Sequence, residues 1–263
     1  MMRTAIENAR IIRAGNITRA NILVEGEKIK SVSTRTFSDA DNRIDAKGQL
    51  VLPGLVDGHA HLYDPAFTNR EDFTSGTSAA AAGGVTTVIE MVLSTPVDSA
   101  ELVKAKIEEG QRRSLIDFSL HAGMMNAENL PNIKSIVGIG VRSFKTFMCK
   151  PYYVDDQTLL SLMRETAKQN SILNVHAEDE EIADRNFHNL TVNGRKDPMA
   201  HLEWKPNIAE ESAVEDAVEM VRKLGGRLHI SHMSTKQGVT LVRDAKKRRV
   251  RVTTETCPHY LTF

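Results

Sequence analysis

Five residues with the chemistry of metal ligands or nucleophiles stand at strand-like runs that lie far apart in the chain. His59 and His61 follow the apolar run QLVLPGLV, His176 and His232 close the runs ILNVH and LHISH, and Lys145 lies within SFKTFM. Positions i and i+2 of a strand face the same side, so His59 and His61 converge as two metal-binding imidazoles must. Imidazoles at equivalent strand ends predict a shared metal centre.

The run RLHISHM contains two histidines, of which strand alternation permits one as a ligand. In a strand, His232 shares a face with Leu228 and Ile230, whereas His229 points the other way. We select His232 because it is nearer to the loop, where the catalytic residues of barrels lie.

Lys145 is flanked by Phe144, Phe147 and Met148, and an ammonium group in an apolar interior is costly. One interpretation is that the side chain reaches outward to solvent. The other is that desolvation lowers the pKa of Lys145 until the amine reacts with CO₂. The resulting carbamate is an anionic oxygen ligand that can bridge two cations.

Several other polar residues lie near these runs. His121 in SLHAGM is expected in the wall of the pocket or just behind it, and His188 and His201 are expected to be solvated. Cys257, at the mouth of the last strand, is expected to pack near the site.

Asp57 shares a strand face with His59 and is expected to orient it or its neighbours. Asn174 and Glu178 could line the pocket, and a structural role for them is equally compatible with the sequence.

The order of the expected elements predicts an α/β barrel preceded by a small β-sheet. The first fifty residues are short β-branched segments with a hairpin near Glu25 to Lys28. Strand-like runs then alternate with helical stretches such as 155–170 and 209–226, which is typical of βαβ units. The seven expected strands are 51–57, 85–92, 116–123, 141–148, 171–178, 227–233 and 250–256.

Seven strands in roughly 210 residues match about thirty residues per βα unit, as in a (β/α)₈ TIM barrel. We therefore expect part of a β-sandwich at 1–50 and barrel strands one to seven at 51–263, with strand eight absent. A doubly wound open sheet is the alternative, but no GxGxxG turn follows the first strand.

Composition excludes several partners. Lysine plus arginine and aspartate plus glutamate number 34 each, so no net field favours nucleic acid or an anionic membrane. Two cysteines without CxxC spacing suit a reducing cytoplasm, and we expect neither a secretory signal nor a membrane span. The expected partner is a small molecule or another protein chain.

The ordered set DGHAHL, SFKTFM, NVHAED, HISHMST and TETCPHYL resembles the cyclic amidohydrolases, which include hydantoinases (dihydropyrimidinases), allantoinases and dihydroorotases. The resemblance implies a TIM barrel of the metal-dependent hydrolase type, a β-sandwich and a homo-oligomer, a dimer or a tetramer. It also implies two divalent metal ions, usually zinc: His59 and His61 bind the first, His176 and His232 the second, and carboxylated Lys145 bridges them.

The resemblance also implies an aspartate at the end of strand eight, as a metal ligand and the general base. That strand would follow Phe263, so no catalytic residue is assigned here. We expect the 263 residues to be a fragment of an active enzyme. Completion by a second chain and loss of activity are the alternatives.

The resemblance implies hydrolysis of a cyclic amide by a metal-bridging hydroxide. Dihydroorotases carry a motif of the form HxHLR, in which the arginine binds the carboxylate of the substrate. In this chain Tyr63 occupies the position of that arginine. That favours a hydantoinase-like or allantoinase-like reaction, with Tyr63, His121 and Cys257 near the substrate. Lys150 stands where hydantoinases usually place an oxyanion tyrosine, with Tyr152 and Tyr153 just beyond. One alternative is a dihydroorotase, because the segment HMSTKQG is similar to one in some dihydroorotases. The other alternative is a non-catalytic scaffold.

Overall fold

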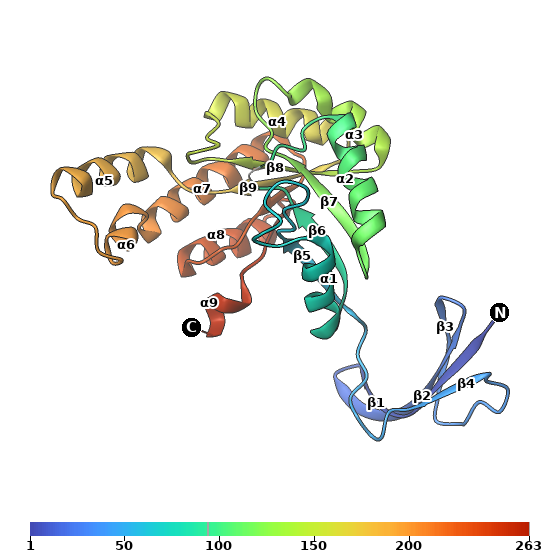
Figure 1. The fold of residues 1–263 in the computed structure, drawn as a ribbon. Helices are drawn as coiled ribbons and strands as arrows, with labels where there is room; N and C mark the ends of the chain where they lie inside the picture. Colours follow the sequence, from blue (N-terminus) through green and yellow to red (C-terminus); the bar gives the residue numbers. More distant parts are fainter. Residues whose placement is uncertain (94, 263) are drawn as a thin grey trace. The chain divides into compact units, whose positions relative to one another are not determined.

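The computed structural model describes residues 1–93 and 95–262 and divides the chain into two compact units, Met1–Leu55 and Val56–Phe263. The first unit is all β, and the second alternates strands with helices (Figure 1).

The first unit is a four-stranded sheet in the order β3-β2-β1-β4. The expected hairpin is confirmed, because Glu25 pairs with Lys28 across the turn between β2 and β3. Ala14 and Gly15 connect β1 to β2 with φ values of 49° and 80°, and two successive positive φ values suit a tight hairpin turn. The strands are β1 (Arg3–Arg13), β2 (Asn16–Glu25), β3 (Lys28–Ser33) and β4 (Asn42–Asp45).

The second unit is built on a seven-stranded sheet in which each strand lies beside the next one along the chain. The pairs from β6 to β11 are parallel. Parallel neighbours in chain order with helical connections confirm the predicted barrel topology with seven strands. The strands are β5 (Leu55–Ala60), β6 (Val85–Met91), β7 (Asp117–Gly123), β8 (Ser143–Phe147), β9 (Ile172–His176), β10 (Leu228–Ile230) and β11 (Val252–Thr254).

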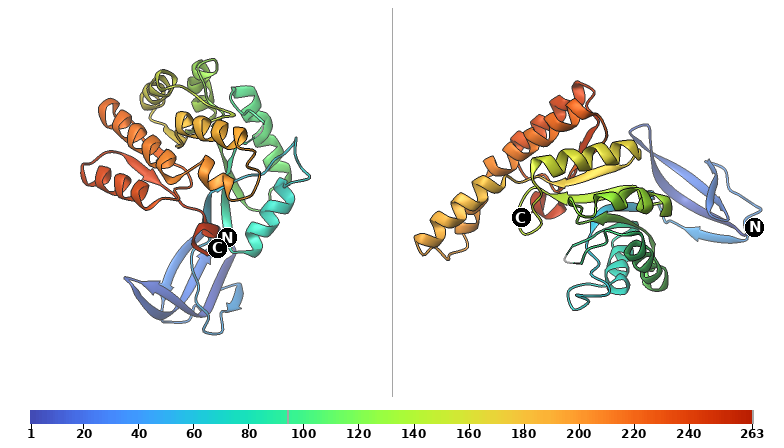
Figure 2. Two further views of the ribbon diagram at one scale, coloured as in Figure 1. Left: turned by 90° about the vertical axis from the view of Figure 1, so that its left-hand side faces the viewer. Right: turned by 90° about the horizontal axis from the view of Figure 1, so that it is seen from above.

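Helices alternate with these strands and lie on the outside of the curled sheet (Figure 2). They are α1 (Phe73–Ala82), α2 (Ala100–Arg113), the short 3₁₀ helix η1 (Leu130–Asn132), α3 (Ile133–Ile139), α4 (Asp156–Lys168), α5 (Glu180–Val192), α6 (Ala200–Trp204), α7 (Asn207–Leu224), α8 (Lys236–Lys247) and α9 (Pro258–Thr262). Within the described residues, no helix is both long and apolar enough to span a membrane.

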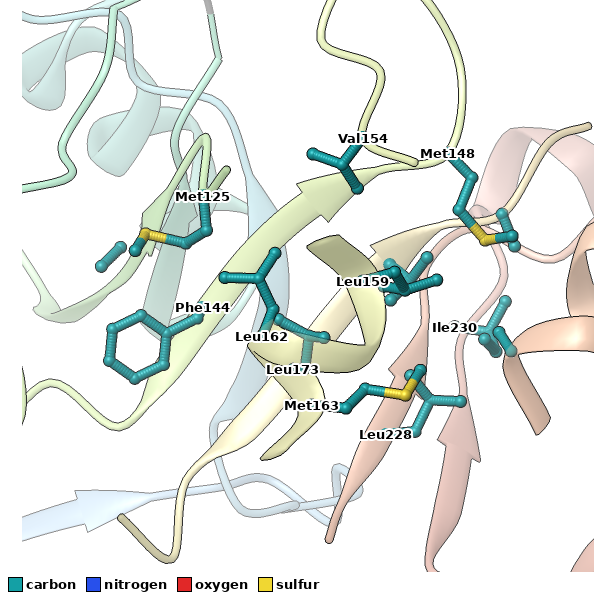
Figure 3. Packing of buried hydrophobic residues seen from close by; sticks show 14 of the residues in the cluster. Met125, Phe144, Met148, Val154, Leu159, Leu162, Met163, Leu173, Leu228 and Ile230 are labelled. Carbon is teal, nitrogen blue, oxygen red and sulfur yellow. The ribbon is translucent and has the colours of Figure 1, made fainter. Parts of the chain in front are cut away.

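Helix α4 shows how the outer layer is fixed by sequence. Asp155 caps its amino end by accepting a hydrogen bond from the main-chain N–H of Thr158. Leu159, Leu162 and Met163 recur at helical spacing and are buried. They pack in one hydrophobic cluster with strand residues such as Phe144 and Leu173 (Figure 3). Burial of this apolar stripe holds the helix against β8 and β9.

Strand alternation sends the other residues of these strands toward the inside of the curl. On β8, Phe144 belongs to the cluster beneath α4, whereas Lys145 and Phe147 line a cavity on the opposite side. Strands β5 and β11 form the two edges of the sheet. The side chains of His59 and Glu255, which lie at the ends of these strands, nevertheless touch, so the sheet curls far enough to bring its edges together.

Candidate metal centre

A cavity of about 340 Å³ opens at the carboxyl ends of the strands. All five residues expected to bind metal line it, although they come from four different strands or strand ends. Its lining consists of His59, His61, Met91, Val92, Leu93, Lys145, Phe147, Cys149, Lys150, Pro151, Tyr152, His176, Lys205 and His232.

His59 and His61 lie at the end of β5 with ring centres 5.2 Å apart. Nδ1 of His59 hydrogen-bonds to the carboxylate of Glu255, and Nδ1 of His61 lies 2.6 Å from the main-chain oxygen of Met91. Both partners accept hydrogen bonds, so each Nδ1 carries the proton and each Nε2 keeps its lone pair. Among the described residues, neither Nε2 has a hydrogen-bond partner, so both can act as ligands.

His176, the last residue of β9, faces His232 across the cavity. Nδ1 of His176 lies 3.1 Å from Nε2 of His232, and Nε2 of His176 lies 3.1 Å from Oε2 of Glu178. The ring of His59 approaches that of His232 to 5.5 Å, which joins the two histidine pairs into one group. A metal ion between His176 and His232 would replace the contact between their two ring nitrogens.

The expectation that His232 shares a strand face with Leu228 and Ile230 is wrong, although His232 does line the cavity. Leu228 and Ile230 pack in the hydrophobic cluster, so a continued strand would send His232 toward the helices. Strand β10 instead ends at Ile230, and His232 has a φ of 38°, in the left-handed region. This turn of the main chain brings His232 to the inner side, where strand alternation alone would have placed His229.

Lys145 is 1% exposed and points into the cavity, so it does not reach outward to solvent. Its Nζ donates a hydrogen bond to Oγ of Ser231 at 2.6 Å and lies 5.2 Å from the ring centre of Phe147. Burial lowers the pKa of Lys145 to about 7. A large fraction of this lysine is therefore a neutral amine near pH 7, the form that reacts with CO₂.

Burial also keeps three of the imidazoles neutral. It lowers the pKa of His61 and of His176, and together with Lys145 and neighbouring histidines it lowers the pKa of His232 to about 2. Neutral imidazole is the form that binds metal. The donor set therefore fits divalent zinc, which prefers nitrogen ligands.

Cys149, His176 and Glu178 form a second possible ligand group, with ligand atoms within 4.8 Å of one another. Burial raises the pKa of the Cys149 thiol to about 12, and Glu178 is already paired with the ammonium group of Lys205. A protonated thiol and a neutralised carboxylate are weak ligands. His176 is therefore better suited to share a metal with His232.

Two carboxylates, those of Glu255 and Glu178, contact imidazoles of the cavity. Burial opposes ionisation of Glu255, but hydrogen bonds from His229 and His59 hold the pKa of that carboxyl well below its usual value. Burial likewise opposes ionisation of Glu178, and His176 and Lys205 nevertheless lower its pKa to about 2. Both side chains are therefore carboxylates that accept N–H donors.

Four further residues expected near the substrate or the metal lie outside the cavity lining. Tyr63 stacks on His61 with ring centres 6.0 Å apart and lines a neighbouring cavity. Cys257 lies beyond β11, and Asp57 accepts a hydrogen bond from the main-chain N–H of His59 at 3.0 Å.

The fourth is His121, which lies behind the cavity. Its Nε2 donates to the main-chain oxygen of Gly58 at 3.0 Å, and its Nδ1 lies 2.6 Å from Oγ of Ser143. With both nitrogens used, His121 ties β5, β7 and β8 together. His188 and His201 are exposed, in agreement with the expected solvation.

The sequence reasoning missed Glu255, Ser231, Lys205 and Cys149. Glu255 is an acidic residue directly after the last strand, a position that could have drawn attention. Lys205 follows the α5–α6 segment and reaches Glu178 from 27 positions away, so no local pattern points to it.

Comparison with known proteins shows the family of the chain. Residues 48–238 match the family model described as Dihydro-orotase-like. An allantoinase from Rubrobacter xylanophilus is 37% identical over 265 residues, which cover 96% of this chain and 58% of the relative. A dihydroorotase from Lactobacillus gasseri is 34% identical over 99% of this chain and 60% of the relative.

Solved structures of a hydantoinase and a dihydropyrimidinase also match this chain. The L-hydantoinase (dihydropyrimidinase) from Arthrobacter aurescens superposes with a TM-score of 0.94 and 32% identity, over 100% of this chain and 60% of that protein. A dihydropyrimidinase from Brevibacillus agri NCHU1002 gives a TM-score of 0.89 and 29% identity, over 100% and 59%. The chain thus spans about three fifths of the length of the relatives that it matches.

Proposed function

The chain belongs to the dihydro-orotase-like family of cyclic amidohydrolases, and from that premise we propose that the protein opens the ring of a cyclic amide at a two-metal centre. The observation that carries the proposal is the cavity in which four imidazoles and one buried amine converge. The ligands in this proposal are His59, His61, Lys145, His176 and His232.

The imidazoles of His59 and His61 would hold one metal, and those of His176 and His232 the other. Lys145 would form a carbamate whose two oxygens reach both sides. When bound, two zinc ions supply a water of lowered pKa and polarise an amide carbonyl. The proposal assigns no general base among the described residues.

The chain's own side chains would orient the substrate ring. Phe147 and Val92 offer apolar surface in the cavity wall, against which a flat ring can pack. Tyr152 also lines the cavity, whereas Tyr153 does not and is 48% exposed. We therefore assign Tyr152 as the phenol that donates a hydrogen bond to the oxygen of the opening carbonyl.

The charge of the cavity favours a neutral ring. Over residues 1–93 and 95–262, no arginine belongs to its lining. Lys205 is paired with Glu178, and Lys150 is paired with Glu180 and Asp184. Apart from Lys145, which the proposal makes a carbamate, the described lining offers a substrate carboxylate no unpaired cationic side chain. We therefore propose hydantoin-like or allantoin-like rings.

Dihydroorotase activity is the second candidate, because dihydroorotases are among the relatives with 34% identity. A non-catalytic scaffold is the third reading and predicts a site without metal. The proposal also includes residues 1–50 as part of a β-sandwich and a homo-oligomeric assembly in the cytoplasm.

The test is a substrate panel on the purified full-length protein: hydantoin, dihydrouracil, allantoin and dihydroorotate, each with added zinc and with a chelator. We expect chelator-sensitive ring opening of one or more of the first three, and its loss in His61→Ala. His188→Ala, which removes an exposed histidine on α5, is the matched control and should keep full activity. Opening of dihydroorotate alone would favour the second candidate, and no opening by zinc-loaded protein would favour the scaffold.

A further inference from the structure

The carboxylate of Glu255 contacts two histidines, one with each of its oxygens. Its Oε1 accepts a hydrogen bond from Nδ1 of His59, and its Oε2 lies 3.4 Å from Nε2 of His229. Glu255 follows β11, His59 lies at the end of β5, and His229 is the middle residue of β10. A single carboxylate therefore connects both edges of the sheet with the strand next to one edge.

The contacts of His229 define its tautomer. Nδ1 of His229 lies 2.8 Å from Oγ1 of Thr253, which can donate its hydroxyl hydrogen. Nδ1 is then the acceptor, so Nε2 carries the proton and points it at Glu255. The carboxylate is thus held by His229 in the orientation in which it accepts from His59.

The same logic fixes His59. A carboxylate only accepts hydrogen bonds, so Nδ1 of His59 must carry the proton. Nε2 of His59 is left with its lone pair, and the ring faces His61 and His232. A ring in the other tautomer would present an N–H where a ligand nitrogen is needed.

We propose that Glu255 is a positioning residue that, braced by His229 and Thr253, fixes His59 in the tautomer able to bind metal. The inference rests on the proposed function, because it assigns a metal to His59. It gives His229 a defined role as a support of the site rather than a ligand. Carboxylates behind metal-binding histidines typically contribute 10–100-fold to affinity.

Glu255→Gln is the informative variant, because the amide keeps the shape but has one acceptor oxygen for two N–H donors. Either His59 or His229 must then face an NH₂ group and change tautomer. The direct readout is a long-range ¹H–¹⁵N spectrum of the histidine rings in metal-free protein, which distinguishes Nδ1–H from Nε2–H. A second readout is the zinc dissociation constant from competition with a chelator.

We expect one uniform Nδ1–H tautomer for His59 in the wild type and a mixture or reversal at His59 or His229 in Glu255→Gln. Zinc affinity at the weakened position should fall by about 10–100-fold. The matched control is Glu215→Gln, which removes a carboxylate from the exposed face of α7 and should change neither readout.

Unchanged tautomers together with unchanged zinc affinity in Glu255→Gln would overturn the inference. His229→Gln is the second variant: it should lower affinity without removing a metal equivalent, and loss of an equivalent would show that His229 is itself a ligand. If Glu255→Gln does not fold, the tautomer of His59 is measured in His229→Gln by the same spectra. Failure of the proposed function is seen separately, as wild-type protein that binds zinc but opens no ring.

Discussion

Nδ1 of His176 lies 3.1 Å from Nε2 of His232, although 56 positions separate the two residues. Each residue stands where a strand has just ended, and the two strands are neighbours in the sheet. Nε2 of His176 faces the carboxylate of Glu178, so Nδ1 of His176 keeps a lone pair that a proton or a cation shared with His232 must satisfy. This relationship is the local reason to expect a metal on that side of the cavity.

Lys145 should carry a carbamate in the presence of CO₂. Burial lowers its pKa to about 7, so the neutral amine predominates at pH 8 and the ammonium form at pH 6. Protein equilibrated with ¹³C-bicarbonate should show a carbamate carbon resonance at pH 8 that weakens at pH 6. Lys145→Ala should lose the resonance, whereas persistence of the signal in that variant would place the carbamate elsewhere.

Gly123→Ala should disturb the site through a backbone contact. A Cβ at position 123 would lie 2.8 Å from Cβ of Lys145 and 3.3 Å from its main-chain oxygen, so β8 must shift. We expect a loss of about 1–3 kcal/mol in the free energy of unfolding and weaker zinc binding. The measurements are urea unfolding and chelator competition.

Gly138→Ala is the control for that variant. Gly138 lies in α3, and an added Cβ there meets nothing within 4 Å. Alanine should leave zinc binding unchanged and add up to about 1 kcal/mol of stability through its helix propensity. Equal zinc affinity in the two variants would contradict the proposed contact with Lys145.

Glu210 should hold the loop that carries His232. Its carboxylate accepts hydrogen bonds from the main-chain N–H and the hydroxyl of both Ser234 and Thr235. Glu210→Gln replaces one acceptor oxygen by a donor, so about 1–3 kcal/mol of stability should be lost. Glu215→Gln on the same helix should lose almost none. Chemical unfolding measures the stability of both variants. Equal losses of stability would show that Glu210 does not hold the loop that carries His232.

His121 should make stability depend on pH. Burial lowers its pKa from 6.5 to about 4, so the neutral ring favours the folded state. Its contribution is fully present above pH 6.5 and is lost as pH falls toward 4. His121→Phe removes both hydrogen bonds and should cost about 1–3 kcal/mol at pH 8.

The difference between wild type and His121→Phe should shrink at pH 5, because the wild type loses the contribution that the variant lacks. Urea unfolding of both proteins in chelator at the two pH values cancels the effect of the other histidines. If the difference in the free energy of unfolding stays constant or widens toward acid pH, the prediction is wrong.

The barrel topology could be predicted because its strands are apolar runs at regular spacing, and helices such as α4 have an amphipathic stripe. The convergence of His59 and His61 followed from strand alternation and the shared end of β5. The burial of Lys145 was one of the two interpretations that its apolar neighbours allowed.

Contacts between distant segments could not be predicted in the same way. The position of His232 depends on a positive φ after a three-residue strand, which alternation does not describe. Glu255 reaches His59 only because the sheet curls until the carboxyl ends of its two edge strands lie close together, and this is a property of the whole sheet. Lys205 reaches Glu178 from beyond two helices, where local sequence has no influence on geometry.

The most direct test of the metal centre is the metal content of the purified protein, measured by elemental analysis beside the variants His59→Ala and His232→Ala. We expect about two divalent ions per chain in the wild type, fewer in each variant, and no change in His188→Ala. The proposed metal centre would be disproved by a wild type that binds no metal when zinc is supplied, or by variants that keep the full complement.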